Sequence, residues 1–213
     1  MNVLQAIRER RAVRDFKPEP VCAGMLYQLV SAASWAPSAM NEQPWQFTII
    51  TDRTVLDEIS ARAKAWMLKN LPAMPRRAHF LDILAEPNFH IFYNAPCLIV
   101  ISVASAGPWT SEDAALAAQN LMLMATDLGL GSCWIGFAQG WLNTAEGHQI
   151  LNLPEGALVV APVIIGHPRT TPPPVARKKP LISWIGQRHF RNGDIGTNTE
   201  SLAPPDHGAS LNP

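Results

Sequence analysis

The stretch Ala36-Pro37-Ser38-Ala39-Met40-Asn41-Glu42-Gln43-Pro44-Trp45 separates a helical apolar pattern from the strand-like run Phe47-Thr48-Ile49-Ile50. Two prolines fix its backbone, and Ser38, Asn41 and Gln43 offer small neutral hydrogen-bonding groups. Such groups suit a planar heterocycle with carbonyls and ring nitrogens better than a metal ion or a bare phosphate. The same residue types are common in ordinary loops, so the stretch alone leaves both interpretations open.

The composition predicts a folded globular protein with one substantial core. The chain has 213 residues, of which 47% are hydrophobic. Lys+Arg and Asp+Glu number 17 each, so the formal net charge is zero. The chain therefore has no net positive charge that would attract nucleic acid or an anionic membrane over a long range. A bound anion must instead be held by locally clustered Arg and Lys.

Cysteine and histidine spacing predicts neither disulfides nor a metal site. Cys22, Cys97 and Cys133 are far apart in apolar contexts, which favours buried free thiols in a reducing compartment. The six histidines form no HxxxH or HExxH spacing. The N-terminus has charges where a signal peptide needs an apolar core, and no apolar run reaches ~18 residues. We therefore expect a cytoplasmic protein.

An arginine cluster follows the first predicted helix. Asn2 is a suitable N-cap for that helix, whose apolar face holds Leu4 and Ile7. In the next run, Arg10-Arg11-Ala12-Val13-Arg14-Asp15-Phe16, the helical spacing of apolar residues gives way to an alternating pattern. Its arginines form either a solvated basic face or a phosphate clamp, because guanidinium groups bind phosphate in bidentate fashion. Clustering in a chain with few charges favours the clamp.

Apolar periodicity predicts the remaining elements. Helices are expected at about 23–35, after an Asp52 cap, from a Ser111 cap to a stop at Gly129, and at about 141–151. Strands are expected at 45–51, 95–103 and 157–165, the last two buried on both faces. The irregular segment 65–92, rich in large side chains and proline, is either a lid over an apolar pocket or an inserted helical pair.

The run Gly129-Leu130-Gly131-Ser132-Cys133-Trp134-Ile135-Gly136 is rich in glycine but is no dinucleotide fingerprint. A fingerprint follows a strand and opens a helix, whereas these glycines follow a helix and enter a strand. Gly131 and Gly136 therefore indicate close backbone approach, either to a neighbouring element or to a flat ligand.

The composition changes near the C-terminus. Residues 172–174 are an extended triple-proline spacer, and Arg177-Lys178-Lys179 is a second basic cluster. Residues 180–185 are expected to form an added strand or a short helix. After Arg191 core-forming residues are scarce, so the sequence predicts one domain at 1–190. The extension 191–213 is then either flexible or laid along a partner.

Together the arginine run and the stretch 36–45 resemble the FMN-dependent nitroreductase family. Later segments match in order: Ala95-Pro96 before a strand, the run 129–136, Pro154-Glu155-Gly156 before a strand ending in Gly166-His167-Pro168, and 177–181. The resemblance covers about residues 4–185. It implies an α+β fold, a three-layer α/β/α sandwich with a central, mostly antiparallel sheet. It also implies a domain-swapped homodimer with FMN at two interface sites.

The family's cofactor contacts carry over to matching positions. The first cluster would serve the phosphate and the pyrimidine edge of the flavin, and Ala12 would contribute its backbone, since the serine often found there is absent. Residues 37–43 would come from the partner subunit, and a backbone N–H of 135–136 would face flavin N5. In the second cluster Lys178 is an alternative to Lys179. The implied cofactor residues are Arg10, Arg11, Ala12, Arg14, Pro37, Ser38, Ala39, Asn41, Gln43, Ile135, Gly136, Arg177 and Lys179.

The resemblance further implies an oxidoreductase. Electrons would pass from NADH or NADPH through flavin to nitroaromatic, quinone or related acceptors by a ping-pong mechanism, with no obligatory catalytic acid or base. Trp66, Phe80 and Phe89 of the lid, with Trp109, are the predicted substrate-pocket residues. Two alternatives are a specialised member that performs dehydrogenation, dehalogenation or flavin modification, and a flavin-binding protein without turnover.

Overall fold

The computed structural model describes residues 1–73, 75, 77–183 and 185. The chain divides into a compact unit, Met1–Pro174, and a second unit, Val175–Pro213. The described residues of the second unit form no helix or strand, so the strand or helix expected at 180–185 is absent from that described part. The extension expected at 191–213 lies outside the described residues.

A four-stranded sheet forms the centre of the compact unit, in the order β1-β2-β4-β3. Its strands are β1 (Trp45–Ile50), β2 (Cys97–Val103), β3 (Gly131–Trp134) and β4 (Leu158–Gly166). All neighbouring pairs are antiparallel, which confirms the predicted sheet type. β2 and β4 are central and almost entirely buried, which explains their continuous apolar sequences.

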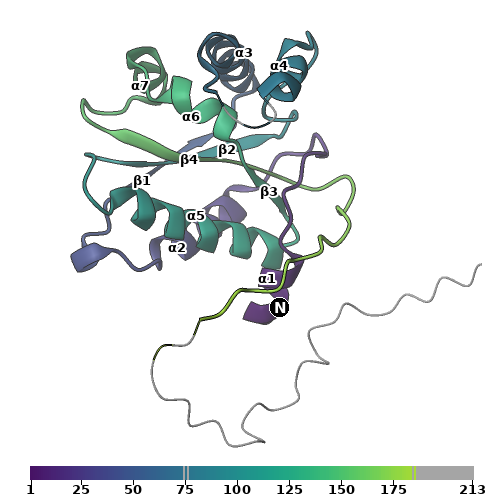
Figure 1. The fold of residues 1–213 in the computed structure, drawn as a ribbon, viewed down its shortest axis with the longest axis vertical. Coiled ribbons are helices and arrows are strands. Elements are labelled where there is room, and N and C mark those ends of the chain that lie inside the picture. The colour runs from purple at the N-terminus through teal and green to yellow at the C-terminus, as the bar shows by residue number, and fades with distance from the viewer. Residues whose placement is uncertain (74, 76, 184, 186–213) are drawn as a thin grey trace, which may run out of the picture. The chain divides into compact units, whose positions relative to one another are not determined.

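Helices cover both faces of this sheet (Figure 1). One layer contains α3 (Arg53–Asn70), α4 (Arg77–Ala85), α6 (Gly136–Leu142) and α7 (Ala145–Leu151). The other contains α1 (Val3–Glu9), α2 (Ala23–Ser34) and α5 (Thr110–Asp127). The predicted three-layer α/β/α arrangement is therefore confirmed. No helix among the described residues is long and apolar enough to cross a membrane.

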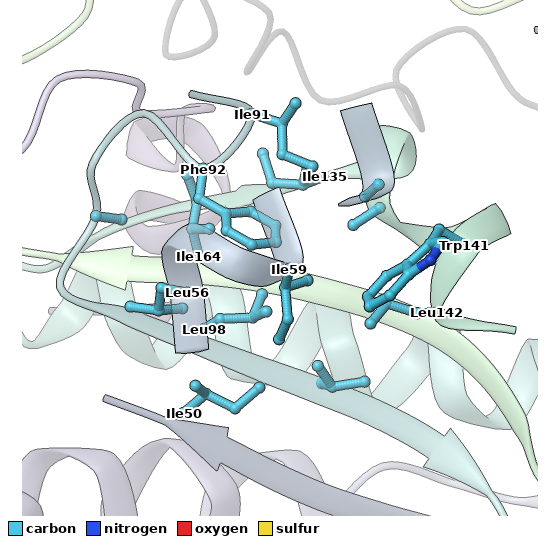
Figure 2. Close-up of a cluster of buried hydrophobic side chains, with 14 of the residues drawn as sticks. Ile50, Leu56, Ile59, Ile91, Phe92, Leu98, Ile135, Trp141, Leu142 and Ile164 are labelled. Carbon is cyan, nitrogen blue, oxygen red and sulfur yellow. The ribbon is translucent and has the colours of Figure 1, made fainter. Parts of the chain in front are cut away.

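Each face of the sheet has its own hydrophobic core. Figure 2 shows the core beneath α3, in which Ile59, Phe92 and Leu142 are fully buried. Leu29, Ile101 and Leu121 belong to the core on the α2 and α5 face. Successive residues of β2 point in turn into one core and then the other, because side chains of a strand alternate between its two faces.

Two predicted helices have different bounds in the structure. The helix expected at 141–151 is two helices, α6 and α7. The break lies at Asn143, whose side chain forms hydrogen bonds with the backbone of β4. It accepts from Val159 N at 2.8 Å and donates to Val159 O at 2.9 Å, and Thr144 then caps α7. The Ser111 cap was also wrong. The Thr110 hydroxyl accepts from Gly107 N at 2.9 Å, so the helix begins at Thr110 after Trp109.

One prediction of burial was wrong in the described chain. Asn2 caps α1 as expected, and Ala6 is the buried residue of this helix, whereas Leu4 and Ile7 are 51% and 49% exposed. Cys22 is exposed at the entrance to α2, whereas Cys97 and Cys133 are buried free thiols. Burial raises the pKa of Cys97 to about 12, so this thiol stays protonated.

Candidate active site

A pocket of about 330 Å³ opens where β3 ends and α6 begins. Arg14, Tyr93 and Cys133 are among its lining residues. Apolar side chains from α3, α4, α6 and the neighbouring turns also line it, among them Met67, Leu71, Phe80, Ile91 and Phe137. A mostly apolar pocket of this size with a few grouped polar atoms is typical of a small-molecule site.

Pairing with the sheet brings the first arginine cluster to this pocket. Val13 N donates to Ser132 O at 3.0 Å, and Ala12 forms a parallel bridge with Ser132, so residues 12–13 run beside β3. Burial raises the pKa of the Cys133 thiol, and the positive charges of Arg14 and Arg10 oppose that rise. Arg14 lines the pocket itself, and the charge of Arg10 acts on Cys133, which also lines it.

Arg11 lies apart from Arg10 and Arg14. Its guanidinium donates to Pro173 O at 3.3 Å and to Arg10 O at 2.9 Å, and its side chain lines a different hollow beside Glu9 and Thr126. Successive side chains of an extended chain point to opposite sides, which separates Arg11 from its neighbours. Of the predicted three-arginine cluster, Arg14 lines the pocket, whereas Arg11 lines a different hollow.

The glycines of the 129–136 run have different surroundings. A Cβ at Gly131 would lie 2.8 Å from atoms of Val13, so this glycine admits the N-terminal segment. A Cβ at Gly136 would meet nothing within 4 Å, although Gly136 lines the pocket. Its N–H is among the first of α6, which have no intrahelical acceptor. Gly131 thus serves a neighbouring element, and Gly136 leaves room for a flat ligand.

The loop that precedes β1 holds strained backbone. Met40, Asn41 and Gln43 have φ values of 50°, 57° and 50°, a region that non-glycine residues rarely adopt. Each such residue costs roughly 1–3 kcal/mol, and strained residues of this kind cluster at functional sites. The Ser38 hydroxyl accepts from Gln43 N at 2.9 Å and so closes the loop.

A buried carboxylate holds this loop against α5. Asp113 is 5% exposed, and its Oδ1 accepts from Ala39 N at 3.0 Å. The sequence placed Asp113 in the first turn of a helix as a partner for the helix dipole, and its contact with the loop was not foreseen. Since the bond joins residues 74 positions apart, no local pattern signals it.

The loop precedes β1 and the pocket opens at the end of β3, and these two strands lie at opposite edges of the sheet (Figure 1). The loop enters β1 at Trp45, which pairs with Val103, whereas β3 leaves the sheet at Trp134, which pairs with Val163. β1 and β3 are the two edge strands, separated by β2 and β4, so about 14 Å of sheet lies between them. One chain therefore does not bring its loop 37–43 to its own pocket.

The four predicted substrate-pocket residues also separate. Phe80 lines the pocket and makes an edge contact with Phe137 at 5.7 Å between ring centroids. Trp66 packs on α6, where a Cβ at Gly140 would lie 2.3 Å from its ring. Phe89 packs beside Tyr93 at the rim. Trp109 is 59% exposed at the start of α5, near the loop that Asp113 holds.

The segment 65–92 contains features of both proposed descriptions. α3 continues to Asn70, beyond the regular pattern in the sequence, and α4 follows. Phe80 of α4 lines the pocket, whereas Leu84 of the same helix is fully buried in the core. The segment is therefore a helical cover that also contributes to the core.

Tyr93 and Cys133 are pocket residues that the sequence analysis missed. Tyr93 and Asn94 both have positive φ values, 51° and 55°. The Tyr-Asn-Ala-Pro order was a turn signal that could have pointed to them, because Asn tolerates this conformation and Pro ends the turn. Cys133 and Trp134 both line the pocket, and the alternation of a short edge strand does not predict that two successive residues do so.

Arg177, Lys178 and Lys179 belong to the second unit. All three are exposed and lie outside any helix or strand. Their expected role at a phosphate stays a prediction.

The chain belongs to the nitroreductase family, whose sequence model matches residues 7–167. A nitrobenzene nitroreductase from Ectopseudomonas oleovorans is 29% identical, covering 75% of this chain and 84% of the relative. An iodotyrosine deiodinase from Thermotoga neapolitana is 26% identical, covering 83% and 94%. A nitroreductase structure with bound FMN from Desulfitobacterium hafniense is 30% identical, with a TM-score of 0.74, and covers 87% of this chain and all of that chain. The predicted family is confirmed.

Proposed function

We propose that the protein is an FMN-dependent oxidoreductase that uses NADH or NADPH to reduce nitroaromatic compounds, quinones or related acceptors. One observation carries the proposal: Arg14 lines an apolar pocket at which Gly136 leaves space for a flat ring, and the positive charge of Arg10 acts on Cys133 of the same pocket. FMN combines a dianionic phosphate with a planar ring, which this set of groups matches. Family membership and the FMN-bound relative add support.

The residues of the pocket would bind and orient this cofactor. When bound, FMN would supply the redox chemistry, since it accepts a hydride and passes electrons on. Arg10 would neutralise phosphate charge and Arg14 would face the pyrimidine edge. The apolar wall of Phe80, Ile91 and Phe137 would exclude water and accept flat aromatic substrates. One pocket would then serve donor and acceptor in turn, as a ping-pong mechanism requires.

The proposed assembly is a homodimer in which each loop 37–43 completes the partner's pocket. Its support is the separation of loop and pocket at opposite sheet edges, together with the strained backbone of an exposed loop. A two-fold axis makes such exchange reciprocal, so a dimer would contain two equivalent sites. Trp109 would accompany the loop. Free thiols at Cys97 and Cys133 agree with a reducing, cytoplasmic setting.

Anaerobic titration tests the function. Purified protein is loaded with FMN, and NADH and NADPH are added separately while flavin absorbance is followed. We expect one or both to bleach the flavin, and nitrobenzene or benzoquinone to restore the colour. A protein that neither carries FMN nor takes it up contradicts the proposal. If the protein binds FMN but neither NADH nor NADPH bleaches it, the result favours the specialised or the non-catalytic alternative. The deiodinase relative is an example of a specialised member.

A further inference from the structure

The pocket contains two side chains from segments far apart in the chain. The Cζ atom of Arg14 lies 5.8 Å from the centroid of the Tyr93 ring, and both residues line the pocket beside Gly136. We propose that Tyr93 is a positioning residue, which holds the Arg14 guanidinium at the flavin ring and thereby sets the reduction potential of bound FMN. This inference rests on the proposed function, because it concerns the cofactor proposed above.

Arg14 depends on the tyrosine ring for its position. Among the described residues no carboxylate forms an ion pair with Arg14, whereas Arg53, Arg62 and Arg169 each have at least one. A guanidinium within about 6 Å of an aromatic centroid is attracted by the ring. The Tyr93 side chain is therefore the group that fixes the charge of Arg14 in the pocket.

Tyr93 is itself held firmly. Its backbone has a φ of 51°, and its N–H donates to His90 O at 2.8 Å, which closes the turn. Phe89 meets the Tyr93 ring edge-on, with centroids 5.5 Å apart. A strained turn of this kind persists only when its surroundings determine it. The ring is thus a rigid support.

The turn is fastened to α3 by polar contacts. The His90 Nδ1 accepts from Phe92 N at 3.2 Å, so its Nε2 carries the proton and donates to Asp57 Oδ1 at 3.0 Å. Arg53 donates to the side chain of Asn94 and pairs with Asp57. Contacts to α3 on either side of Tyr93 thus set the position of its ring.

The chemistry of this pair favours the reduced cofactor. Reduction adds negative charge to the flavin ring, and a fixed positive group stabilises that charge without reorganising first. Burial raises the pKa of Tyr93 above its ordinary value of 10. The phenol therefore stays neutral at physiological pH and does not neutralise Arg14. A loosened Arg14 would stabilise the reduced form less, so the potential would fall.

Tyr93→Leu, Tyr93→Phe and Arg14→Lys test the inference by spectroelectrochemical titration of bound FMN. We expect Tyr93→Leu to lower the equilibrium constant for two-electron reduction about tenfold, which corresponds to about 30 mV. Tyr93→Phe keeps the aromatic face and should stay within about twofold of the wild type. Arg14→Lys keeps the charge but loses the planar guanidinium beside the ring, so the equilibrium constant should fall as much as in Tyr93→Leu. In the double variant Arg14→Lys/Tyr93→Leu the constant should fall no further.

The chain has only one other tyrosine, Tyr27, which is 75% exposed on α2 and provides the matched control. Tyr27→Leu should leave the potential unchanged. A wild-type potential in FMN-loaded Tyr93→Leu overturns the inference, as does a Tyr93→Phe shift as large as that of Tyr93→Leu. If Tyr93→Leu does not fold, an unshifted Arg14→Lys is decisive against it. If the wild-type protein binds no FMN, the proposed function is contradicted as well. Failure of the proposed function is therefore distinguishable from failure of the inference about Tyr93.

Discussion

The two edges of the sheet carry the two most informative motifs, but they are built differently. At the β3 edge, Arg14 and Gly136 belong to a pocket that one chain forms by itself. At the β1 edge, the loop 37–43 is strained and largely exposed, and Asp113 holds it in place. The difference teaches that one chain forms the first region as a pocket, whereas the second region is an exposed loop with a fixed conformation. The proposed dimer would give that loop its role, as part of the partner's site.

The largest expected effect follows removal of Arg10 and Arg14. Arg10→Ala/Arg14→Ala should weaken FMN binding at least ~100-fold, because under the proposed function each arginine would form charge-assisted hydrogen bonds to the cofactor. Fluorescence titration of apoprotein with FMN measures this. Arg11→Ala provides the contrast, since Arg11 contacts Pro173 and faces a different hollow. An equal loss in Arg11→Ala would show that all three arginines act at one site.

Mixed dimers test whether the two regions come from different chains. One chain carries Arg10→Ala/Arg14→Ala, the other carries Asn41→Ala, and different tags allow purification of the mixed species. If each loop completes the partner's pocket, a mixed dimer has one intact and one doubly damaged site and binds about one FMN. If each site lies within one chain, both sites are damaged. FMN content per dimer, measured by absorbance after denaturation, separates the two results.

Asp113 allows a finer test of the β1 edge. Asp113→Ala removes the acceptor of the Ala39 N–H and should weaken FMN binding about tenfold, because the strained loop then samples other conformations. Asp113→Asn is the matched variant, since an amide oxygen still accepts this bond. FMN affinity should stay within about threefold of the wild type. Equal losses in both variants would assign the role to the charge.

Gly140 tests how far the pocket edge depends on its helical cover. A Cβ at this position would lie 2.3 Å from the Trp66 ring, so Gly140→Ala should force α3 and α6 apart. We expect a loss of about 1–3 kcal/mol, or a lower Tm by roughly 2–12 °C. Gly24→Ala in α2 is the control, because a Cβ there meets nothing within 4 Å and alanine favours a helix. Differential scanning calorimetry compares the two variants.

The smallest expected effect is on the stability of the protein at acidic pH. Burial lowers the pKa of His90 below its usual 6.5. The unfolded chain therefore binds a proton before the folded chain as the pH falls through 6.5, so stability is lost below that value. Protonation would also replace the acceptor that Phe92 N uses. His90→Gln should reduce the fall in Tm between pH 7.5 and 5.5 by a few degrees (roughly 1–4 °C). An unchanged fall would exclude His90 as its source.

Apolar patterns predicted most helices and the buried strands, because β2, β4 and α5 have strong periodicity, whereas the layers and the sheet type were implied by the family resemblance. These patterns failed where a distant contact decides local structure. Asn143 divides one expected helix by bonding to Val159, and Asp113 reaches the loop across 74 positions. The pocket motifs were visible as residue types. Which arginine turns toward the pocket depends on the pairing of residues 12–13 with Ser132, which no pattern in the arginine run contains.

Lys64 on α3 has a consequence for how this protein acquires new substrates. Its ammonium group binds the carbonyl oxygens of Glu86, Pro87 and Phe89, directly after α4. This fixes the point at which the cover ends, so replacement of residues in α4 leaves the turn with Tyr93 where it is. Under the proposed roles of Phe80 and Tyr93, substrate preference and cofactor tuning would then evolve separately. A directed-evolution library confined to α4, with Lys64 kept, should yield altered acceptors from variants that retain the parental flavin potential.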